Sequence, residues 1–384
     1  MISNLRNWFG AFIGMLAIFT ISAERSPADS RPGTQLRVNT QDAVSYQENV
    51  AHTGSIRFST GFAMPLAKAW STSLSGKWAS YPIIAGGMIF VNEASTQQTY
   101  ALNLTTGATV WSQKTGAYTF GPAYDNGLVF TADGIATMYA LSAQTGATKW
   151  KASIAAGNII AINGQVFAYD AGSYGLTALS ESNGQIQWSQ AVAELGLIPG
   201  YGNTGVLSVS SCQYAMFNPA SGAQVWHFDG GCYGLNFSTP VSFHKRVYIT
   251  DIDLENSIRS GRTGRSLGTF ISHGYPPAIY AVSGQTLAFS LDTDSYNNST
   301  LYAWDASTGT TVWTASCTCT VAPIVVNGHV IIGDNGGNVY ALAAKTGKQE
   351  WTDNVGGIVR QLSAGDGTLI VINDGGTVTA FVPS

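Results

Sequence analysis

Four cysteines carry the most direct chemistry in this sequence: Cys212, Cys232, Cys317 and Cys319. An even number of cysteines in an exported chain favours disulfide bonds. A bridge between Cys212 and Cys232 would close a loop whose cross-linking contributes roughly 3 kcal/mol. Cys317 then pairs with Cys319 or stays free, because spacing alone does not give the connectivity. We expect these cysteines to have a structural role.

Oxygen-bearing side chains alternate in two segments, as they do in calcium loops. The better segment contains Asp292, Asp294, Asn297 and Asn298, and Asp251–Glu255 is a poorer version. The better segment lacks the glycine at the sixth position and the closing glutamate that calcium loops carry. Short polar residues are also expected wherever strands turn. We interpret both segments as solvated turns and predict no metal site.

Hydrolytic chemistry finds little support in the sequence. The nucleophile elbow Gly-x-Ser-x-Gly is absent, since Gly172–Gly175 lacks its spacing. His244–Arg246 is expected to form a charged tip of a turn. The five histidines show no metal-ligand spacing: they are His52, His227, His244, His273 and His329. We predict no catalytic residue.

The composition describes a chain of short strands and tight turns. Only 10% of the 384 residues are charged, and glycine occurs 44 times. Few charges with many glycines and aromatic residues favour strands over helices or disorder. The net charge of −4 gives no reason to expect a nucleic-acid partner.

The first residues resemble an export signal. Arg6 precedes an apolar run from Trp8 to Ile21, and Ser22 and Ala23 are small enough for cleavage. We predict a signal peptide at residues 1–23, a flexible polar leader at 24–44 and one folded domain at 45–384. The run is short for a membrane span of ~20 residues, although a retained anchor is the alternative. The protein would then be periplasmic or extracellular, with no stable membrane span after cleavage.

One segment, Tyr340–Trp351, recurs with drift along almost the whole chain as Tyr-Ala-Leu-x-x-x-Thr-Gly-x-x-x-Trp. The copies follow one another at roughly 40 residues, which is the period of β-propeller blades. A buried indole suits the space between stacked sheets. The expected docking residues are Trp70, Trp111, Trp150, Trp188, Trp226, Trp313 and Trp351.

Each repeat contains four short strands, as a propeller blade does. Seven internal repeats and one repeat split between the two ends of the domain predict eight blades in an all-β ring. One repeat, residues 227–270, keeps Thr263–Gly264 but has Gly268 where the tryptophan should be. We interpret this change as drift, and a surface for a partner is the alternative. The chain ends with Thr368–Phe381, which lacks a closing strand, and Leu66–Trp70 can supply it. The N- and C-terminal strands are therefore expected to share one blade and close the ring.

The repeated pattern resembles the tryptophan-docking motif of the quinoprotein, or PQQ-like, repeat family. This resemblance covers about residues 45–384 and implies an eight-bladed propeller. The family includes quinone-dependent alcohol dehydrogenases and the BamB-like assembly factors of outer-membrane proteins. Fold alone does not separate these functions.

The dehydrogenases of this family hold their quinone between a tryptophan and a disulfide of adjacent cysteines, beside a calcium ion and a catalytic aspartate. This sequence has no adjacent cysteines, and its nearest feature is Cys317–Cys319. Trp78 is the candidate for a stacking floor, with ordinary cover of the channel mouth as the alternative. We expect no cofactor, and PQQ with Ca²⁺ remains the alternative.

The loops that enter the blades carry a set of aromatic residues. If the repeats align as described, these residues gather on one face around the channel and bind a protein or a small molecule. Plugging of the channel is the alternative role. The candidate ligand-binding residues are Trp78, Tyr81, Tyr118, Tyr201, Tyr233, His273 and Tyr275.

The sequence therefore predicts an exported, monomeric propeller that acts as a non-catalytic binding or scaffolding module. The first alternative is a PQQ- or metal-dependent oxidoreductase. The second is an assembly factor for outer-membrane proteins, although no cysteine near the signal provides a lipoprotein anchor.

Overall fold

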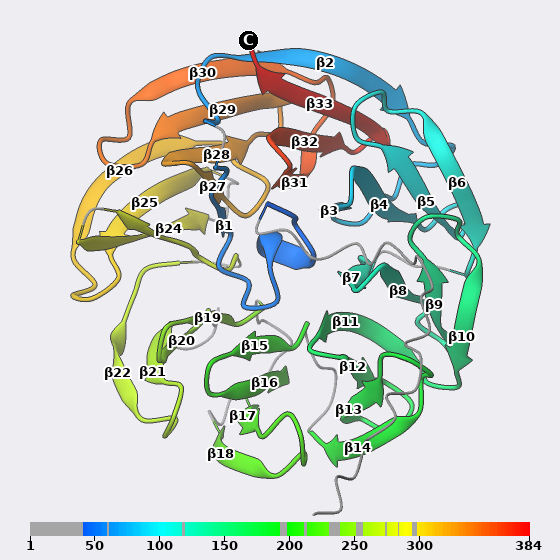
Figure 1. The fold of residues 1–384 in the computed structure, drawn as a ribbon. Helices are drawn as coiled ribbons and strands as arrows, with labels where there is room; N and C mark the ends of the chain where they lie inside the picture. Colours follow the sequence, from blue (N-terminus) through cyan, green and yellow to red (C-terminus); the bar gives the residue numbers. More distant parts are fainter. Residues whose placement is uncertain are drawn as a thin grey trace, which may run out of the picture. The chain divides into compact units, whose positions relative to one another are not determined.

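The computed structural model describes residues 41–384 apart from residues 60, 117–119, 193–197, 211–212, 230–238, 251–255, 273–274, 283 and 294–297. Eight antiparallel sheets surround a central channel (Figure 1). The prediction of an eight-bladed β-propeller is therefore confirmed. Blades 1 to 8 are numbered here in chain order, starting from the sheet that begins at β3.

Blades 1 to 4 each take four consecutive strands, arranged from the channel outward. They are β3 (Ile83–Ala85), β4 (Met88–Glu93), β5 (Gln98–Asn103) and β6 (Thr109–Lys114); β7 (Ala123–Asp125), β8 (Leu128–Ala132), β9 (Met138–Ser142) and β10 (Thr148–Ala152); β11 (Ala156–Ile162), β12 (Gln165–Asp170), β13 (Gly175–Ser180) and β14 (Ile186–Ala191); and β15 (Gly200–Gly202), β16 (Gly205–Ser210), β17 (Gln213–Phe217) and β18 (Gln224–Asp229).

Blades 5 to 8 repeat this order, and the last of them takes its outer strand from the start of the domain. They are β19 (Val241–Phe243), β20 (Arg246–Ile249), β21 (Ser257–Ser260) and β22 (Ser266–Thr269); β23 (Ala278–Val282), β24 (Gln285–Thr293), β25 (Ser299–Asp305) and β26 (Thr311–Cys317); β27 (Ile324–Val326), β28 (His329–Gly333), β29 (Asn338–Ala343) and β30 (Gln349–Asn354); and β31 (Val359–Gly365), β32 (Thr368–Asn373), β33 (Thr377–Pro383) and β2 (Leu66–Ser73).

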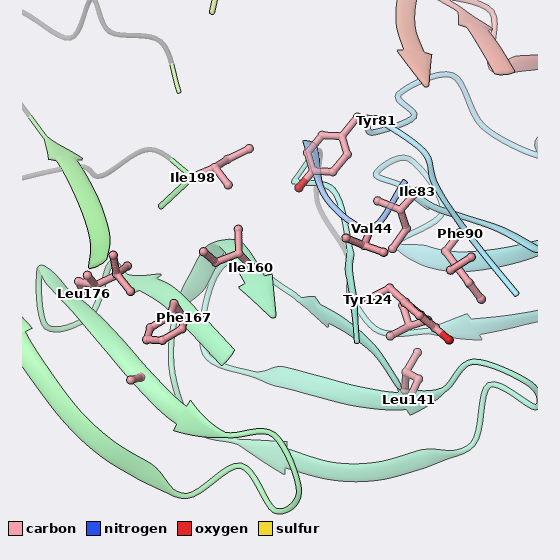
Figure 2. Packing of buried hydrophobic residues seen from close by; sticks show 14 of the residues in the cluster. Val44, Tyr81, Ile83, Phe90, Tyr124, Leu141, Ile160, Phe167, Leu176 and Ile198 are labelled. Atoms are coloured by element: carbon pink, nitrogen blue, oxygen red, sulfur yellow. The ribbon is translucent and has the colours of Figure 1, made fainter. Parts of the chain in front are cut away.

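Burial changes from the inner to the outer strand of a blade in the way the sequence pattern requires. All three residues of β3 are buried, whereas β30 alternates between exposed and covered side chains. An inner strand packs on both faces, and an outer strand leaves one face to solvent. Figure 2 shows part of a buried cluster that links blades 1 to 4 and includes Val44, Tyr124 and Phe167.

Seven of the blade interfaces are closed by the same indole contact. Each tryptophan donates its Nε1–H to a backbone carbonyl of the next blade at 2.7–2.9 Å, as Trp111 does to Ala143. In six of these interfaces the ring covers the glycine of the next turn between third and fourth strands: a Cβ at Gly146 would lie 2.8 Å from the ring of Trp111. Next to Trp351 this turn position is Ala69. The motif is therefore a lock between blades, made of one indole, one carbonyl and one glycine.

Blade 5 lacks this lock. Gly268 pairs with Ile258 in the register that Trp111 and Ala101 have in blade 1. The small and large residues have changed places across the two strands. Trp304 of blade 6 stands where the repeat has leucine, is fully buried, and stacks on Phe270 at 5.1 Å between ring centroids. Ile258 and Trp304 thus fill part of the space that a docked indole occupies elsewhere.

Because blade 5 lacks the docked indole, a glycine-to-alanine change should destabilise the turn of blade 6 less than the equivalent turn of blade 7. Gly347 and Gly309 both have positive φ, 70° and 75°, so alanine strains the backbone alike at each. A Cβ at Gly347 would lie 2.8 Å from the Trp313 ring, whereas at Gly309 it meets only the Thr269 carbonyl at 3.2 Å. We expect Gly347→Ala to lower the free energy of unfolding by about 1–3 kcal/mol more than Gly309→Ala. Urea unfolding of both variants measures the difference, and equal midpoints would contradict the indole lock.

The ring closes as predicted, through a blade shared by both ends of the domain. β2 pairs antiparallel with β33, from Leu66 opposite Pro383 to Ser73 opposite Thr377. Figure 1 shows β2 in blue beside β33 in red. Within the described residues, the chain offers no helix with the length and apolar character that a membrane crossing requires.

Candidate functional site

The central channel is occupied by the chain itself. Residues 42–57, called the channel segment here, contain the 3-10 turn η1 (Tyr46–Glu48) and the short strand β1 (Ser55–Ile56), which lie inside the ring of blades in Figure 1. β1 pairs in parallel with β27. Gln41, the first described residue, also contacts the ring, since its carbonyl accepts from the Asp366 amide at 2.8 Å. Contacts with the ring therefore extend four residues ahead of the expected domain boundary at residue 45.

Backbone hydrogen bonds connect the channel segment to the inner strands of six blades. Carbonyl groups of the segment accept from amides of blades 1, 2, 4, 5, 6 and 7 at 2.7–3.0 Å. An inner strand has an unpaired edge that faces the channel, and a buried unpaired amide is costly. The segment therefore satisfies the edges that the closed ring leaves open. The donating amides are those of Ile84, Tyr124, Tyr201, Ser242, Ile279 and Val325.

Blade 8 is contacted by a side chain of the channel segment. The buried carboxyl group of Glu48 accepts hydrogen bonds from the Ser363 hydroxyl at 3.0 Å and from the Ala364 amide at 3.2 Å. Burial raises the pKa of Glu48 to about 8, although both hydrogen bonds act in the opposite direction. The carboxyl group therefore keeps its proton at neutral pH.

His52 is a second buried titratable group of the channel segment. Its Nδ1–H donates to the Pro240 carbonyl at 3.0 Å, and Nε2 has no partner among the described residues. Burial lowers the pKa of His52 to about 4. A neutral imidazole and a protonated carboxyl group thus leave the channel without a formal charge on either side chain at pH 7.

The predicted aromatic residues lie in different environments. Tyr81 is buried against Tyr46, with ring centroids 5.1 Å apart, and burial raises its pKa. Tyr275 is half-buried and donates its hydroxyl to the Thr320 carbonyl at 3.0 Å. Tyr201 belongs to β15, and its hydroxyl accepts from Asn163 Nδ2 at 3.3 Å. Their contacts are those of packing residues, and their role in binding stays a prediction. Tyr118, Tyr233 and His273 lie outside the described residues.

Trp78 differs from these residues because it is exposed. It belongs to a group of three large apolar side chains on consecutive blades, with exposed fractions of 66% for Trp78, 75% for Ile135 and 55% for Tyr174. Trp78 precedes β3, while Ile135 and Tyr174 lie in turns between second and third strands. Strand direction places these loops at the same face of the ring, which we call the entry face. The sequence analysis did not single out Ile135 or Tyr174.

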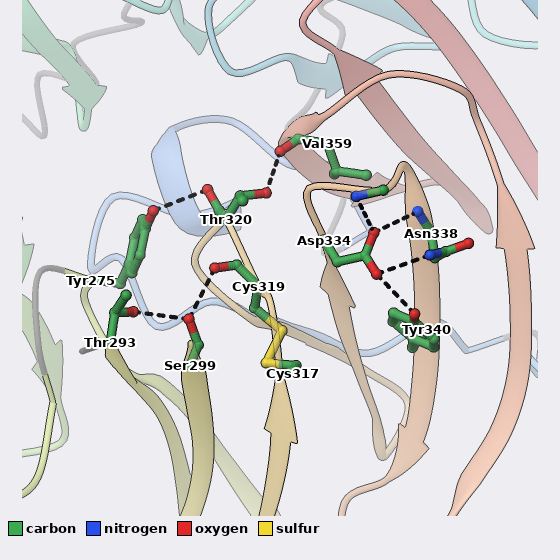
Figure 3. Close-up of a disulfide and its surroundings, with 11 residues drawn as sticks. Tyr275, Thr293, Ser299, Cys317, Cys319, Thr320, Asp334, Asn338, Tyr340 and Val359 are labelled. Carbon is green, nitrogen blue, oxygen red and sulfur yellow. Dashed lines mark hydrogen bonds between the residues drawn. A yellow bond between two sulfur atoms is a disulfide. The ribbon is translucent and has the colours of Figure 1, made fainter. Parts of the chain in front are cut away.

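Acidic side chains organise the entry-face turns. Asp334 accepts from the amides of Gly336 and Asn338 at 2.9 and 2.8 Å, and from the Tyr340 hydroxyl at 2.8 Å (Figure 3). Burial alone would raise the pKa of Asp334, but these hydrogen bonds hold it below its usual range. Asp292 is the last residue but one of β24, the second strand of blade 6. Asp251–Glu255, Asp294 and Asn297 lie outside the described residues.

A disulfide joins Cys317 and Cys319, whose Cα atoms are 5.3 Å apart (Figure 3). It was one of the two alternatives that the sequence left open. Cys317 ends the outer strand β26 and borders a cavity of about 620 Å³ between blades 6 and 7. Asp334 and Tyr340 of blade 7 also line this cavity. The predicted Cys212–Cys232 bridge lies outside the described residues.

The residues present do not fit a quinone as the family's dehydrogenases hold it. The Cys317–Cys319 disulfide lies at an outer strand, Trp78 is exposed on blade 1, and the channel segment fills the centre. Among the described residues, no three histidine, cysteine or acidic side chains cluster as a metal site would need. We therefore derive no chemistry through a quinone.

Known structures share this architecture. BamB from Moraxella catarrhalis superimposes with a TM-score of 0.66 at 16% identity, covering 83% of this chain and 98% of that one. Quinohemoprotein alcohol dehydrogenase from Comamonas testosteroni gives 0.69 at 14% identity, covering 89% and 80%. At such low identity these likenesses concern the fold alone.

Sequence comparison adds one curated relative and one family. Tetrathionate hydrolase of Acidithiobacillus ferrooxidans is 35% identical over 116 residues, which are 29% of this chain and 22% of that protein. The chain thus spans about a fifth of that relative. Residues 67–121, 96–228 and 213–384 match the family described as outer membrane protein assembly factor BamB. Together with the eight-bladed fold and its indole locks, this match shows that the chain belongs to the BamB family of PQQ-repeat β-propellers.

Proposed function

We propose that this protein is an exported, non-catalytic binding module that takes a protein partner on its entry face. The observation that carries the proposal is the row of exposed apolar side chains on blades 1 to 3, formed by Trp78, Ile135 and Tyr174. The filled channel supports it as well, because it leaves the outer faces for recognition. Membership of a family of assembly factors favours a protein as the partner.

The three apolar side chains stand on rigid turns. Asp133 accepts from the amides of Ile135, Ala136 and Thr137 at 2.8 Å each, which fixes the tip that presents Ile135. Asp170 accepts from the amide of Gly172 and the hydroxyl of Ser173, in the turn that carries Tyr174.

Trp78 is held in the same way. Its amide donates to Glu93 Oε1 at 3.4 Å, and its carbonyl accepts from the Ala94 amide at 2.9 Å. A contact surface that is ordered before binding loses less entropy when a partner docks. Exposed tryptophan and tyrosine are the residue types that most often dominate protein interfaces.

Site-directed photo-cross-linking tests this proposal in the cells that export the protein. A benzophenone amino acid at position 78, 135 or 174 is expected to give the same discrete cross-linked protein. Matched controls carry the same probe at Val110, Ile186 or Val225, which are exposed apolar residues of outer strands. Products only from the outer-strand positions, or none from the entry face, would contradict the proposal.

Polythionate hydrolysis is a second candidate, and one observation favours it: the 35% identity over 116 residues to tetrathionate hydrolase. Incubating the purified chain with tetrathionate and measuring thiosulfate and sulfate decides between the two. Turnover that survives mutation of Trp78, Ile135 and Tyr174 would replace the binding proposal with a catalytic one.

A further inference from the structure

Blade 5 departs from the repeat in its outer strand and in its first hairpin. Its outer strand has Gly268 instead of the docking tryptophan. Its first hairpin has His244-Lys245 at the tip, and Arg246 follows directly. The third-to-fourth-strand turn of blade 6, around Ala306, lies opposite this hairpin and lacks its indole partner. A pocket of about 350 Å³ lies between them.

The hairpin tip breaks a rule that most of the other blades obey. Five first hairpins have Asn, Asp or Gly followed by Gly at the tip, both residues with positive φ, as in Asn126-Gly127 at 46° and 79°. This is the chemistry that a two-residue hairpin prefers. In blade 5, His244 takes the first position with φ 54°, and Lys245 replaces the glycine. A departure from local turn preference points to a selected side chain.

Arg246 occupies the hydrogen-bonding position of the missing indole. In six of the seven locked interfaces, the carbonyl that accepts from tryptophan lies three residues before a turn glycine, as Ala143 does before Gly146. In blade 6 that carbonyl is Ala306, and it accepts from Arg246 Nη1 at 2.8 Å and from the Tyr248 hydroxyl at 3.3 Å. The contact from Nη1 holds the guanidinium at the wall of the pocket.

The guanidinium keeps donors for a ligand. It has five N–H donors in a planar fork, and the carbonyl groups of Ala306 and Ser307 engage Nη1 alone. Lys245 and His244 are exposed at the rim, and the His244 ring lies edge-on against Phe243 with centroids 4.2 Å apart. The pocket thus joins a basic rim to an aromatic wall.

The charge of the pocket is opposite to that of the chain. Among the described residues, its lining includes Lys245, Arg246 and His244 and no acidic side chain. The nearby carboxylate of Asp305 accepts from the amides of Ser307 and Thr308, so it is directed into its own turn. In a chain of net charge −4, this pocket gathers positive charge at one hairpin.

We propose that this pocket binds a small organic carboxylate, with the carboxylate on Arg246 and Lys245 and the apolar body against Phe243. A planar guanidinium fork matches the geometry of a carboxylate. A volume of about 350 Å³ suits a small ligand and excludes a folded domain. This site is independent of the entry face proposed for a protein partner, because it lies among first hairpins and third-to-fourth-strand turns.

Calorimetric titration of the purified chain with benzoate, phenylacetate and succinate tests the proposal. Saturable binding of at least one ring carboxylate is expected, with benzyl alcohol as the uncharged comparison. Arg246→Gln is expected to weaken binding by roughly ten- to hundredfold, the value of a hydrogen bond to a charged group. Added salt should weaken it as well.

A second variant protects the test against misfolding. His244→Asn with Lys245→Gly restores the tip sequence of Asn126-Gly127, so the hairpin is expected to fold at least as well while binding weakens. Lys149→Gln, at an exposed outer-strand position, is the charge-matched control and should bind as the parent does. No saturable binding of any of the three carboxylates, or equal affinity in the parent and both pocket variants, would overturn the proposal.

Discussion

Replacing Trp351 with alanine is expected to lower the free energy of unfolding by about 3–5 kcal/mol, the range for a buried large aromatic. Its indole is buried, donates to the Leu66 carbonyl at 2.9 Å and packs edge-on against Phe381 at 5.1 Å between centroids. Leu66 comes from the first part of the domain and Phe381 from the last. This single ring therefore contacts both halves of the shared blade.

Denaturant unfolding measures this loss, and two variants divide it into parts. Trp351→Phe keeps an aromatic ring but removes the N–H donor, so it should cost less than alanine while leaving the Leu66 carbonyl unpaired. Trp78→Ala removes an exposed indole and is expected to change stability by no more than about 0.5 kcal/mol. Equal unfolding midpoints for Trp351→Ala and Trp78→Ala would contradict the idea that the docked indoles hold the ring together.

The ring could be predicted from the sequence because its lock is made of residues that repeat together. Six of the seven docked indoles lie on a glycine of the next turn, as Trp313 lies on Gly347. The tryptophan and the glycine of each interface therefore recur together in the sequence at the period of the blades. The shared blade followed for the same reason, since Trp70 recurs in step with the other docking residues although its sheet partners lie more than 300 positions away, as in the pairing of Trp70 with Ala380.

The channel segment could not be predicted in this way. It binds inner strands through its own backbone carbonyls, as Val50 and Ala51 do, and backbone groups leave no residue-type signature. The aromatic set was predicted from loop positions alone, which do not distinguish a packed Tyr81 from an exposed Trp78. Exposure depends on whether another chain segment covers the residue, and here that segment is distant in sequence.

The role of Arg246 was equally hidden in the sequence. The loss of the tryptophan at Gly268 was visible and was interpreted as drift. In the structure, Trp304 and Ile258 fill part of the gap, and Arg246 donates to the carbonyl of Ala306. Each replacement sits on a different strand, so a comparison of repeats one position at a time does not connect them.

Glu48→Gln is expected to remove a loss of stability that the parent protein suffers above about pH 6.5. The folded state holds the Glu48 proton up to about pH 8 because the carboxyl group is buried. In the unfolded chain an ordinary glutamate loses its proton near pH 4.3. Between these values the folded state binds the extra proton, so stability falls as pH rises, by about 1.4 kcal/mol per pH unit.

His52 has the opposite effect on the pH dependence of stability and limits the pH range in which the effect of Glu48 is visible. Its pKa is lowered to about 4 in the folded state, whereas an unfolded histidine titrates near pH 6.5. Between about pH 4 and 6.5 the unfolded state binds the extra proton, so this group makes stability rise with pH. The two slopes offset each other below pH 6.5. From there to about pH 8 His52 no longer offsets the decline due to Glu48, which amounts to about 2 kcal/mol.

Urea unfolding of the parent and of Glu48→Gln at pH 5.5, 6.5 and 8 measures this difference. The variant keeps a neutral side chain that can still accept from Ser363 and Ala364. Its free energy of unfolding should therefore change with pH as the parent's does, without the decline that Glu48 causes. Glu181, whose pKa burial raises to about 7, contributes a decline of the same sign in both proteins and cancels in the comparison. Asp353→Asn removes a carboxylate at a surface position and is the control variant. A difference in free energy of unfolding between the parent and Glu48→Gln that stayed constant from pH 5.5 to 8 would contradict this prediction. The Glu48 carboxyl group would then be ionised in the channel. A buried charge needs a cationic partner, and the described residues place none beside it.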